Sequence, residues 1–260
     1  MFEQVERNGV RVLTSTALEA EVGVRVAFTG RASGAAESLN VSYNVGDDPS
    51  LVARNRGLVS EALELPLDRW VLGQQVHGRV VTEVGPLEVG RGAREGHSAL
   101  PGADGLVTSL EDVSLAVLTA DCVPLIFVAP LGNTIGVVHA GWRGVLAGIV
   151  SVGLRNVMWP AAGMKCLVGP HIGPCCMDVS EDVADAFERE FHGKDVVQGS
   201  KRRSLDLFRA CSSQLLAAGV REKDIFNSGF CTMCSGEYFS YRADASCGRQ
   251  MSIACIVGAR

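Results

Sequence analysis

The stretch from Leu115 to Gly144 constrains the fold more than any other part of the chain. It contains two apolar runs rich in Val, Ile, Leu and Phe, one at 115–118 that continues through 123–129 and one at 135–138, and turn-forming residues at 130–133 separate them. Short apolar runs bounded by Pro, Gly and Asn are typical of buried strands. The stretch therefore predicts two buried strands joined by a turn.

Side chains that bind metals or act as nucleophiles stand at the ends of these runs. Cys122 lies in the segment TADCVP, and His139 opens the segment HAGWRG. A pair of strands can bring such positions together at one end of a sheet, where a third ligand from upstream would complete a metal site. His77, in LGQQVHGRVV, is the candidate for that ligand. Cys122 and His139 alone would suffice for a Cys–His catalytic pair.

The composition is that of a folded globular protein with no strong preference for a charged partner. The chain has 260 residues, of which 47% are hydrophobic and 20% are charged, and its formal net charge is −5. Such a length fits one large domain or two small ones. The negative net charge and the scarcity of dense Lys/Arg runs argue against nucleic acid or an anionic membrane as the main partner.

The cysteines and the N-terminal segment favour a reducing compartment. The first ten residues show neither the basic nor the apolar part of a secretory signal. The longest apolar stretch is interrupted by Asp121 and Pro124, which leaves it too short for a membrane span. Nine cysteines, an odd number in a long chain, indicate free thiols rather than a disulfide framework. We therefore expect a cytoplasmic protein.

The rest of the chain predicts one α+β domain of mixed sheets with helices outside. Asp48 and Pro49 are typical of a helix start, so a helix is expected over 48–63. The segment 70–84 predicts a strand, a bend at His77 and a second strand. Further strands are expected within 22–28, 105–108 and 165–169, and the tail over 230–257 is expected to form two strands around a loop. Further helices are expected over 145–158, 180–191 and 204–219, and loops over 29–44 and 86–104.

Two kinds of chemistry are open to the same three residues. Two imidazoles and one thiolate suit Zn²⁺, and three protein ligands leave the fourth tetrahedral position for water or substrate, as in catalytic zinc sites. Without a metal, Cys122 would act as a nucleophile and His139 as its base. Asp121 would either orient an imidazole or cap a turn, and the turn is the favoured role.

Three polar residues elsewhere are candidates for substrate binding. Arg143 lies at an expected strand-to-helix transition, where a guanidinium and free N–H groups would bind phosphate or carboxylate. The alternative for Arg143 is stacking on Trp142, and Arg242, in SYRAD, has the same ambiguity. Asn40, in a long polar segment, would hydrogen-bond a base or a sugar, or would serve turn geometry instead.

The remaining cysteines invite comparison with zinc knuckles. The chain contains a CxxC motif at 231–234 and an adjacent pair of cysteines at 175–176. Adjacent cysteines rarely serve as paired ligands of one tetrahedral site, and the sequence has no second CxxC motif. Buried free thiols are therefore the favoured interpretation.

A series of short motifs runs in order along nearly the whole chain: SLN (38–40), GDDP (46–49), NR (55–56), QVHG (75–78), ADCVPL (120–125), HAGWRG (139–144), IGPCC (172–176), LDL (205–207), CT (231–232) and FSYR (239–242). This series resembles the bacterial laccase-domain family, whose members are also described as multicopper polyphenol oxidases, peptidoglycan editing factors or purine nucleoside phosphorylases of the laccase-domain type. QVHG, ADCVPL and HAGWRG together are highly specific for it.

The resemblance implies a four-layer α/β/β/α sandwich over residues 1–260, a single domain similar to some cysteine hydrolases. It also implies that His77, Cys122 and His139 bind a metal and carry out catalysis. The implied activities are phosphorolysis of adenosine, inosine, guanosine and methylthioadenosine, together with adenosine deamination. Amide hydrolysis in a peptidoglycan precursor and copper-dependent polyphenol oxidation are the alternatives. Met177 departs from the aromatic residue expected after the cysteine pair.

The histidine content separates these activities. A multicopper oxidase needs a blue-copper centre and a trinuclear cluster with many imidazole ligands, whereas this chain has five histidines and none in an HxH pair. We therefore expect Zn²⁺ as the cofactor, with Cu²⁺ as the alternative, and a purine nucleoside phosphorylase whose partners are a small nucleoside and phosphate. The sequence indicates no evident general acid for phosphorolysis or deamination.

Overall fold

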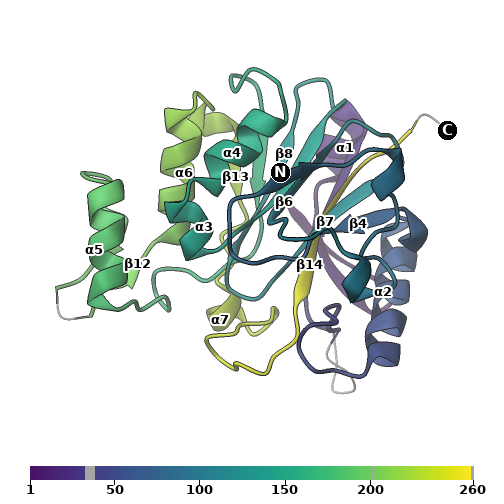
Figure 1. The fold of residues 1–260 in the computed structure, drawn as a ribbon, viewed down its shortest axis with the longest axis horizontal. Coiled ribbons are helices and arrows are strands. Elements are labelled where there is room, and N and C mark those ends of the chain that lie inside the picture. Colours follow the sequence, from purple (N-terminus) through teal and green to yellow (C-terminus); the bar gives the residue numbers. More distant parts are fainter. Residues whose placement is uncertain (33–38, 201, 259–260) are drawn as a thin grey trace.

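The computed structural model describes residues 1–32, 39–200 and 202–258. Two six-stranded mixed sheets form its centre, and helices lie on both sides of them (Figure 1). The first sheet has the order β1 (Glu3–Arg7), β2 (Val10–Thr14), β3 (Val24–Thr29), β14 (Gln250–Ile256), β7 (Ser114–Thr119) and β4 (Trp70–Leu72). The second has the order β13 (Ile225–Asn227), β10 (Lys165–Val168), β8 (Val123–Val128), β9 (Ile135–Ala140), β6 (Gly105–Thr108) and β5 (Val81–Glu83).

Helices cover the outer faces of this pair of sheets. In Figure 1, α2 lies on one side of the strands, and α3, α4 and α6 lie on the other. The helices are α1 (Thr16–Val22), α2 (Pro49–Leu63), α3 (Trp142–Leu146), α4 (Ile149–Asn156), α5 (Glu181–Glu190), α6 (Leu207–Ala217) and α7 (Thr232–Ser235), and β11 (Val197–Gln198) pairs with β12 (Ser204–Leu205) beside α5. The expected α+β sandwich of mixed sheets is confirmed.

Three hydrophobic cores separate the four layers. The central core lies between the sheets and includes Leu115 of β7 and Ile126 of β8. A second core joins the outer face of the second sheet to α4 and α6, with Phe127 and Leu215 among its members. The third lies between α2 and the outer face of the first sheet, around Trp70. Each sheet is therefore buried on both faces, which explains why their central strands are apolar throughout.

Strand β8 illustrates this burial residue by residue. Val123, Leu125 and Phe127 belong to the core on the helix side, whereas Ile126 and Val128 belong to the core between the sheets. All five side chains are fully buried. Because burying one such side chain contributes about 1.5–3 kcal/mol, this short strand is a major source of stability, and it holds the residues next to it in place.

The apolar run expected as one strand from 115 to 129 is two strands in different sheets. Strand β7 ends in the first sheet, and β8 begins in the second after a crossover of three residues. Within the crossover Asp121 has a φ of 88°, a left-handed conformation that turns the chain sharply. The prediction of one continuous strand is therefore wrong, and Cys122 lies on the crossover itself. The second expected strand, 135–138, is confirmed as β9.

Most of the other expected elements are present, with two differences. The helix expected over 48–63 is α2, and the Asp48 side chain caps it by accepting the N–H of Ser50 at 2.8 Å. The helix expected over 145–158 is interrupted, because Gly148 has a φ of 82° and separates α3 from α4. The tail contains the short helix α7 and the long strand β14 instead of two strands.

The polar segment 29–44 is less exposed than a surface loop should be. Residues 33–38 lie outside the described part of the chain, but residues 39–42 are buried. The buried Arg56 of α2 explains this, because its Nε donates to the Val41 carbonyl at 2.8 Å. A helix side chain thus holds this segment against the protein.

Candidate metal and substrate site

Three separate segments bring His77, Cys122 and His139 together. Cys122 precedes β8, and the antiparallel register of β8 and β9 pairs Pro124 with His139, so both side chains lie at the same end of the second sheet. His77 comes from the loop between β4 and β5, where it has a φ of 60°. One ligand atom from each of the three side chains lies within 4.8 Å of the others. We call this group the His₂Cys site.

Asp104, which the sequence did not single out, orients the His₂Cys site. It is fully buried just before β6. Its Oδ1 accepts from Nδ1 of His139 at 2.8 Å and from the N–H of His77 at 3.0 Å, and its Oδ2 accepts from the N–H groups of Val76 at 3.2 Å and Gly78 at 2.7 Å. Because Nδ1 of His139 faces this carboxylate, Nε2 is left to bind a metal.

The charges of the site favour an anionic sulfur. Burial raises the pKa of the Cys122 thiol, but the charge and hydrogen bonds of His139 and His77 outweigh burial and lower this pKa to about 6. Burial lowers the pKa of His139, but Cys122 and Asp104 outweigh it and raise this pKa to about 9. The neighbouring imidazoles therefore favour the thiolate of Cys122, which is the form of cysteine that binds metals.

A glycine leaves the space that two of the three side chains occupy. Gly141 follows β9, and a Cβ atom built on it would lie 2.8 Å from Cδ2 of His77 and 3.2 Å from Sγ of Cys122. The first distance is shorter than real Cβ contacts allow. The close approach of His77 and Cys122 therefore requires a glycine at position 141, the first glycine of the HAGWRG motif.

The ligand set fits a divalent metal ion. In a tetrahedral zinc site with bonds of about 2.0–2.3 Å, ligand atoms lie roughly 3.3–3.8 Å apart, and the three ligand atoms here lie within 4.8 Å of one another. One thiolate and two imidazoles suit zinc, and imidazole also suits copper. With three protein ligands, a tetrahedral ion would keep one position for another molecule.

A cavity of about 600 Å³ opens beside the His₂Cys site, and all three side chains line it. This volume lies within the range of pockets that hold small molecules. Apolar groups on its wall include Trp142, Ile172 and the buried Met177, the residue that departs from the expected aromatic. Polar groups on the wall include Ser42, Asn44, Gln75, Asp121, Arg143, Tyr241, Arg242 and Arg249. The cavity therefore combines flat apolar surface with several cationic groups.

Both arginines expected at the site line this cavity. Arg143 lies in the first turn of α3, and its guanidinium carbon stands 4.3 Å from the ring centre of Trp142. Arg143 therefore both stacks on Trp142 and lines the cavity. The guanidinium of Arg242 donates to the carbonyl groups of Cys176 at 3.3 Å and Asp178 at 2.9 Å. Because backbone carbonyl groups hold the guanidinium of Arg242, that of Arg143 is the freer of the two to bind a ligand.

The structure does not bring Asn40 to the cavity wall. Asn40 is fully buried, and its Nδ2 donates to the Ser42 carbonyl at 3.0 Å and to the Asp47 carboxylate at 2.6 Å. Its Oδ1 accepts the N–H groups of Ser42 at 3.0 Å and Arg249 at 2.8 Å. Asn40 therefore joins the segment before α2 to the segment before β14. Because its polar atoms are occupied by these bonds, the expectation that it binds substrate is not supported.

Asp121 holds the crossover and does not contact an imidazole. Its Oδ1 accepts from the hydroxyl of Thr232 at 2.6 Å, and its Oδ2 accepts from the N–H of Arg242 at 2.7 Å. Its own carbonyl accepts the N–H of Ile172 at 2.9 Å. The crossover that carries Cys122 is thereby fixed to the loop after β10 and to the segment around α7.

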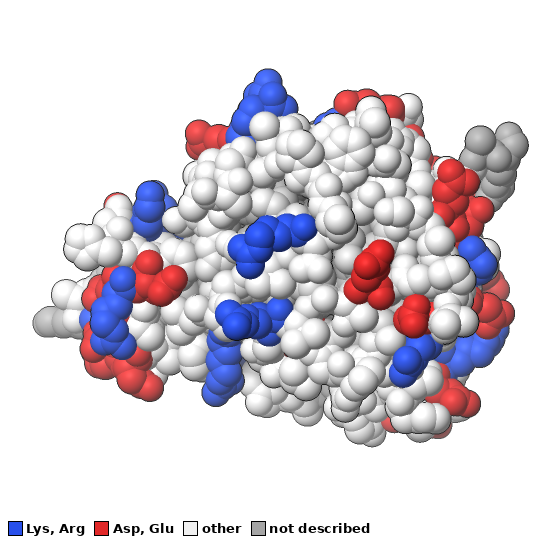
Figure 2. Space-filling model, turned by 45° about the horizontal axis from the view of Figure 1, so that its top comes forward, with Lys and Arg blue, Asp and Glu red and all other residues white. Residues whose placement is uncertain are grey.

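The charges on the face shown in Figure 2 form no continuous basic surface, because basic and acidic side chains are interspersed with wide uncharged areas. Among the described residues, no helix is both long enough and apolar enough to cross a bilayer.

Comparisons with known proteins agree with this architecture. A family model described as "Multi-copper polyphenol oxidoreductase laccase" matches residues 25–257. The purine nucleoside phosphorylase YlmD of Geobacillus stearothermophilus is 36% identical over 97% of this chain and 96% of its own. The crystal structure of YlmD from that organism superimposes with a TM-score of 0.90 at 34% identity and covers 99% of both chains.

A second solved structure, the hypothetical protein YfiH of Bacillus licheniformis, has a TM-score of 0.87 at 30% identity and covers 94% of this chain and 96% of its own. Sequence motifs, fold and overall similarity thus agree over almost the entire chain. This protein belongs to the multi-copper polyphenol oxidoreductase laccase family.

Proposed function

We propose that this protein is a zinc-dependent purine nucleoside phosphorylase that acts on adenosine, inosine, guanosine and methylthioadenosine, with adenosine deaminase activity in the same cavity. The observation that carries the proposal is the His₂Cys site on the wall of a cavity that also presents Arg143 and a flat apolar surface. A relative that aligns with nearly the whole chain is named a purine nucleoside phosphorylase, which supports the same activity. The free thiols favour the reducing cytoplasm as its compartment.

His77, Cys122 and His139 would hold the zinc ion, with Cu²⁺ as the alternative metal. When bound, such an ion supplies Lewis-acid polarisation of a substrate or water oxygen. Asp104 keeps the proton of His139 on Nδ1, so that the ring presents Nε2 to the site. The same carboxylate holds the backbone of His77 in place, so that ligand geometry is fixed before any substrate binds.

Arg143 is the residue that we assign to phosphate. A guanidinium presents two parallel N–H donors that match the oxygens of phosphate, and stacking on Trp142 holds the group at the cavity. Phosphorolysis breaks the bond between the purine and ribose C1′, a carbon that becomes oxocarbenium-like as the bond breaks. Phosphate held by Arg143 would attack this carbon as the purine departs, and the products would be the free purine, which takes up a proton, and ribose 1-phosphate. Trp142, Ile172 and Met177 offer the apolar surface against which a purine would pack.

Adenosine deamination would use water in place of phosphate. The attack would fall on purine C6, and ammonia would leave to give inosine. Because this reaction needs no phosphate, it should proceed without the contact that Arg143 makes in phosphorolysis. The two activities should therefore separate in an arginine variant.

The test is a coupled product analysis on the zinc-loaded protein. Adenosine with inorganic phosphate should give adenine and ribose 1-phosphate, and adenosine without phosphate should give inosine and ammonia. Cys122→Ala should lose both activities, whereas Cys255→Ala, a matched loss of a buried thiol on β14, should keep them. Normal turnover by the Cys122 variant, or release of adenine that does not depend on phosphate, would refute the proposal.

A hydrolase is the second candidate, and one observation favours it. Cys122, His139 and Asp104 form a nucleophile, base and orienting-carboxylate series, with 2.8 Å between His139 and Asp104. Such a series would hydrolyse an amide in a peptidoglycan precursor, release an amino acid and ignore phosphate. Product analysis therefore separates it from phosphorolysis.

The word multi-copper in the family description does not suit the imidazoles of this chain. Beyond the two of the His₂Cys site, His97 is exposed and lies beside Glu95, His171 is buried against the Gly169 carbonyl, and His192 is exposed. The described residues therefore provide no second group of histidines for a trinuclear copper cluster. Copper-dependent polyphenol oxidation ranks below the other two activities.

A further inference from the structure

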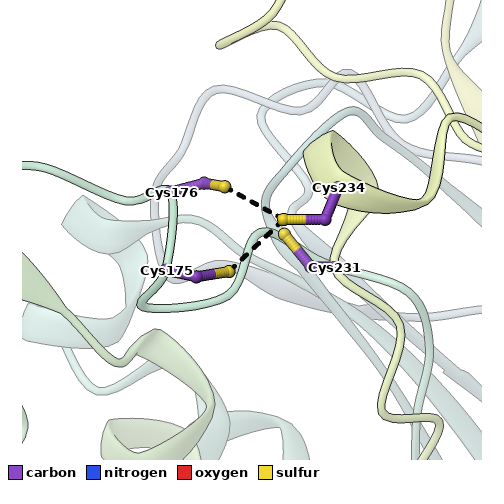
Figure 3. A group of neighbouring side chains, drawn as sticks. All are labelled: Cys175, Cys176, Cys231 and Cys234. Atoms are coloured by element: carbon purple, nitrogen blue, oxygen red, sulfur yellow. Dashed lines mark hydrogen bonds between the residues drawn. The ribbon is translucent and has the colours of Figure 1, made fainter.

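Four cysteines from two distant segments converge on a single point. Cys175 and Cys176 lie in the loop after β10, and Cys231 and Cys234 lie at the start and within the first turn of α7. Their sulfur atoms all lie within 4.8 Å of one another. Figure 3 shows the four side chains pointing toward each other, with Sγ of Cys234 3.3 Å from Sγ of Cys176 and 3.6 Å from Sγ of Cys175. We call this group the four-cysteine cluster.

The local backbone explains how adjacent cysteines can point the same way. The loop turns tightly after Gly173, whose carbonyl accepts the N–H groups of Cys176 at 3.0 Å and Met177 at 3.1 Å. In an extended segment, neighbouring side chains would point to opposite sides. In this turn both sulfur atoms face α7. Adjacent cysteines rarely serve as paired ligands of one site, and this turn shows how Cys175 and Cys176 can nevertheless face the same partner.

The second segment supplies an ordinary half of a metal site. Cys231 and Cys234 are three residues apart on one helical turn, so their side chains lie on the same face. The N–H of Gly173 donates to Sγ of Cys231 at 3.3 Å. A hydrogen bond from a backbone N–H to the sulfur stabilises the thiolate form that a metal requires.

The dimensions of the cluster match those of one tetrahedral ion. With metal–sulfur bonds of about 2.3 Å, the sulfur atoms of a tetrahedral site lie about 3.8 Å apart. Two of the separations here are 3.3 and 3.6 Å, and every other separation is at most 4.8 Å. Cys175 and Cys234 are exposed, so an ion can reach the cluster from solvent.

We propose that the four-cysteine cluster is a second metal site, which binds one Zn²⁺ through four thiolates and serves a structural role. Four protein ligands leave no position for substrate, which is the arrangement of structural zinc sites. Tetrahedral sets of four sulfurs suit zinc or iron. Among the described residues, the His₂Cys site and this cluster are the two groups with cysteine and histidine ligands at such distances.

The position of the cluster indicates what the ion would stabilise. The loop that carries Cys175 and Cys176 also carries Ile172 and Met177 of the cavity wall. The segment around α7 reaches the Cys122 crossover, because Thr232 donates to Asp121 at 2.6 Å. An ion in the cluster would hold these two segments together. It would thereby hold one wall of the cavity at a fixed distance from the His₂Cys site.

The experiment isolates the cluster by removing the other site. The double variant Cys122→Ala/His77→Ala keeps one of the three ligands of the His₂Cys site and all four cysteines of the cluster. Purified with zinc and a thiol reductant and then freed of unbound metal, it should retain about one zinc ion per chain, against about two in the wild type. Its zinc X-ray absorption spectrum should show about four sulfur neighbours at about 2.3 Å.

A second double variant removes the cluster instead and leaves the His₂Cys site intact. Cys231→Ala/Cys234→Ala should retain about one zinc ion per chain, held with nitrogen neighbours, and the matched control Cys255→Ala should retain about two. Should Cys231→Ala/Cys234→Ala fail to fold, the X-ray absorption spectrum of Cys122→Ala/His77→Ala still decides the question.

Three results would overturn the proposal. The first is a Cys122→Ala/His77→Ala protein that folds but retains no zinc. The second is a retained metal that is iron, or zinc whose neighbours are mainly nitrogen or oxygen. The third is a thiol titration of the wild-type protein purified with zinc that finds two or four thiols of the cluster lost as disulfides. None of these measurements depends on the proposed phosphorylase activity.

Discussion

Replacing Asp104 by Asn tests how the His₂Cys site is held in place. The two oxygens of Asp104 each accept two hydrogen bonds, from His139 and His77 on one side and from Val76 and Gly78 on the other. An amide has nearly the same shape as a carboxylate, but an NH₂ group, which donates hydrogen bonds, replaces one of the two oxygens. With its NH₂ group toward Val76 and Gly78, the amide deprives two backbone N–H groups of their acceptor. Turned the other way, it faces the N–H of His77 and forces the ring proton of His139 from Nδ1 to Nε2. The variant therefore breaks two bonds without opening a cavity.

The expected effects follow from the charge of the lost acceptor. Hydrogen bonds to charged groups contribute about 1.5–3 kcal/mol each, so losing two should lower the free energy of unfolding by about 3–6 kcal/mol. Removing a carboxylate that orients a metal-binding histidine should also weaken metal binding by about 10–100-fold. Both effects should appear together, since the same carboxylate holds His139 and the loop of His77.

The stability difference should also depend on pH. Burial raises the pKa of the Asp104 carboxyl, but hydrogen bonds from His139 and from backbone N–H groups outweigh it, and the net pKa is lower than usual. A carboxyl whose pKa is lower in the folded state contributes stability above its unfolded pKa of about 3.9, and loses it as the pH falls through the folded value. The wild type should therefore exceed Asp104→Asn most near neutral pH and least in acid.

Urea unfolding of the metal-free proteins, from neutral pH to acid, measures the loss of stability and its pH dependence. Competition for zinc with a chelator measures the loss of metal affinity. Asp48→Asn is the matched control, because Asn caps a helix about as well as Asp and Asp48 lies at the exposed start of α2. An Asp104→Asn protein with wild-type zinc affinity and an unchanged unfolding midpoint would refute this account of the site.

Three further substitutions test other parts of the structure. Gly141→Ala should weaken zinc binding by at least about tenfold while the circular dichroism spectrum stays unchanged, since the new Cβ would lie 2.8 Å from the His77 ring; unchanged affinity would contradict the close packing. Arg143→Met should raise the KM for phosphate by about tenfold or more and spare deamination, and equal losses in both reactions would exclude a phosphate-specific role. Ile126→Ala, in the core between the sheets, should lower the unfolding free energy by about 2–5 kcal/mol, and a urea midpoint close to that of the wild type would show that the two sheets do not depend on this contact.

The sequence predicts the fold well where burial alone decides it. The apolar runs at β8 and β9 and the cap at Asp48 depend on local patterns that survive in the folded protein. The crossover at Asp121 was missed because a left-handed residue between two apolar runs leaves no mark in their hydrophobicity. The break at Gly148 was missed for a similar reason, since the residues on both sides keep a helical pattern.

The meeting of the three side chains of the His₂Cys site was predictable from the sequence, but the residues around them were not. His77, Cys122 and His139 stand in distinctive motifs, and the structure brings all three to one cavity. Asp104 stands alone in a turn-rich segment, and its importance arises only when the register places it beside His139. For Asn40 the sequence left substrate binding and turn geometry open, and only the structure shows that its polar atoms form hydrogen bonds within the protein.

Two of the three side chains of the His₂Cys site, His77 and Cys122, lie where the chain passes from one sheet to the other. The loop of His77 leads from β4 to β5, and the crossover of Cys122 leads from β7 to β8, so an ion shared by them would join both passages at one end of the sandwich. Amide hydrogens in these passages should therefore exchange with solvent more slowly as the ion concentration rises. Amide hydrogens of β1 and β2, at the far edge of the first sheet, should exchange at a rate that does not depend on the ion concentration.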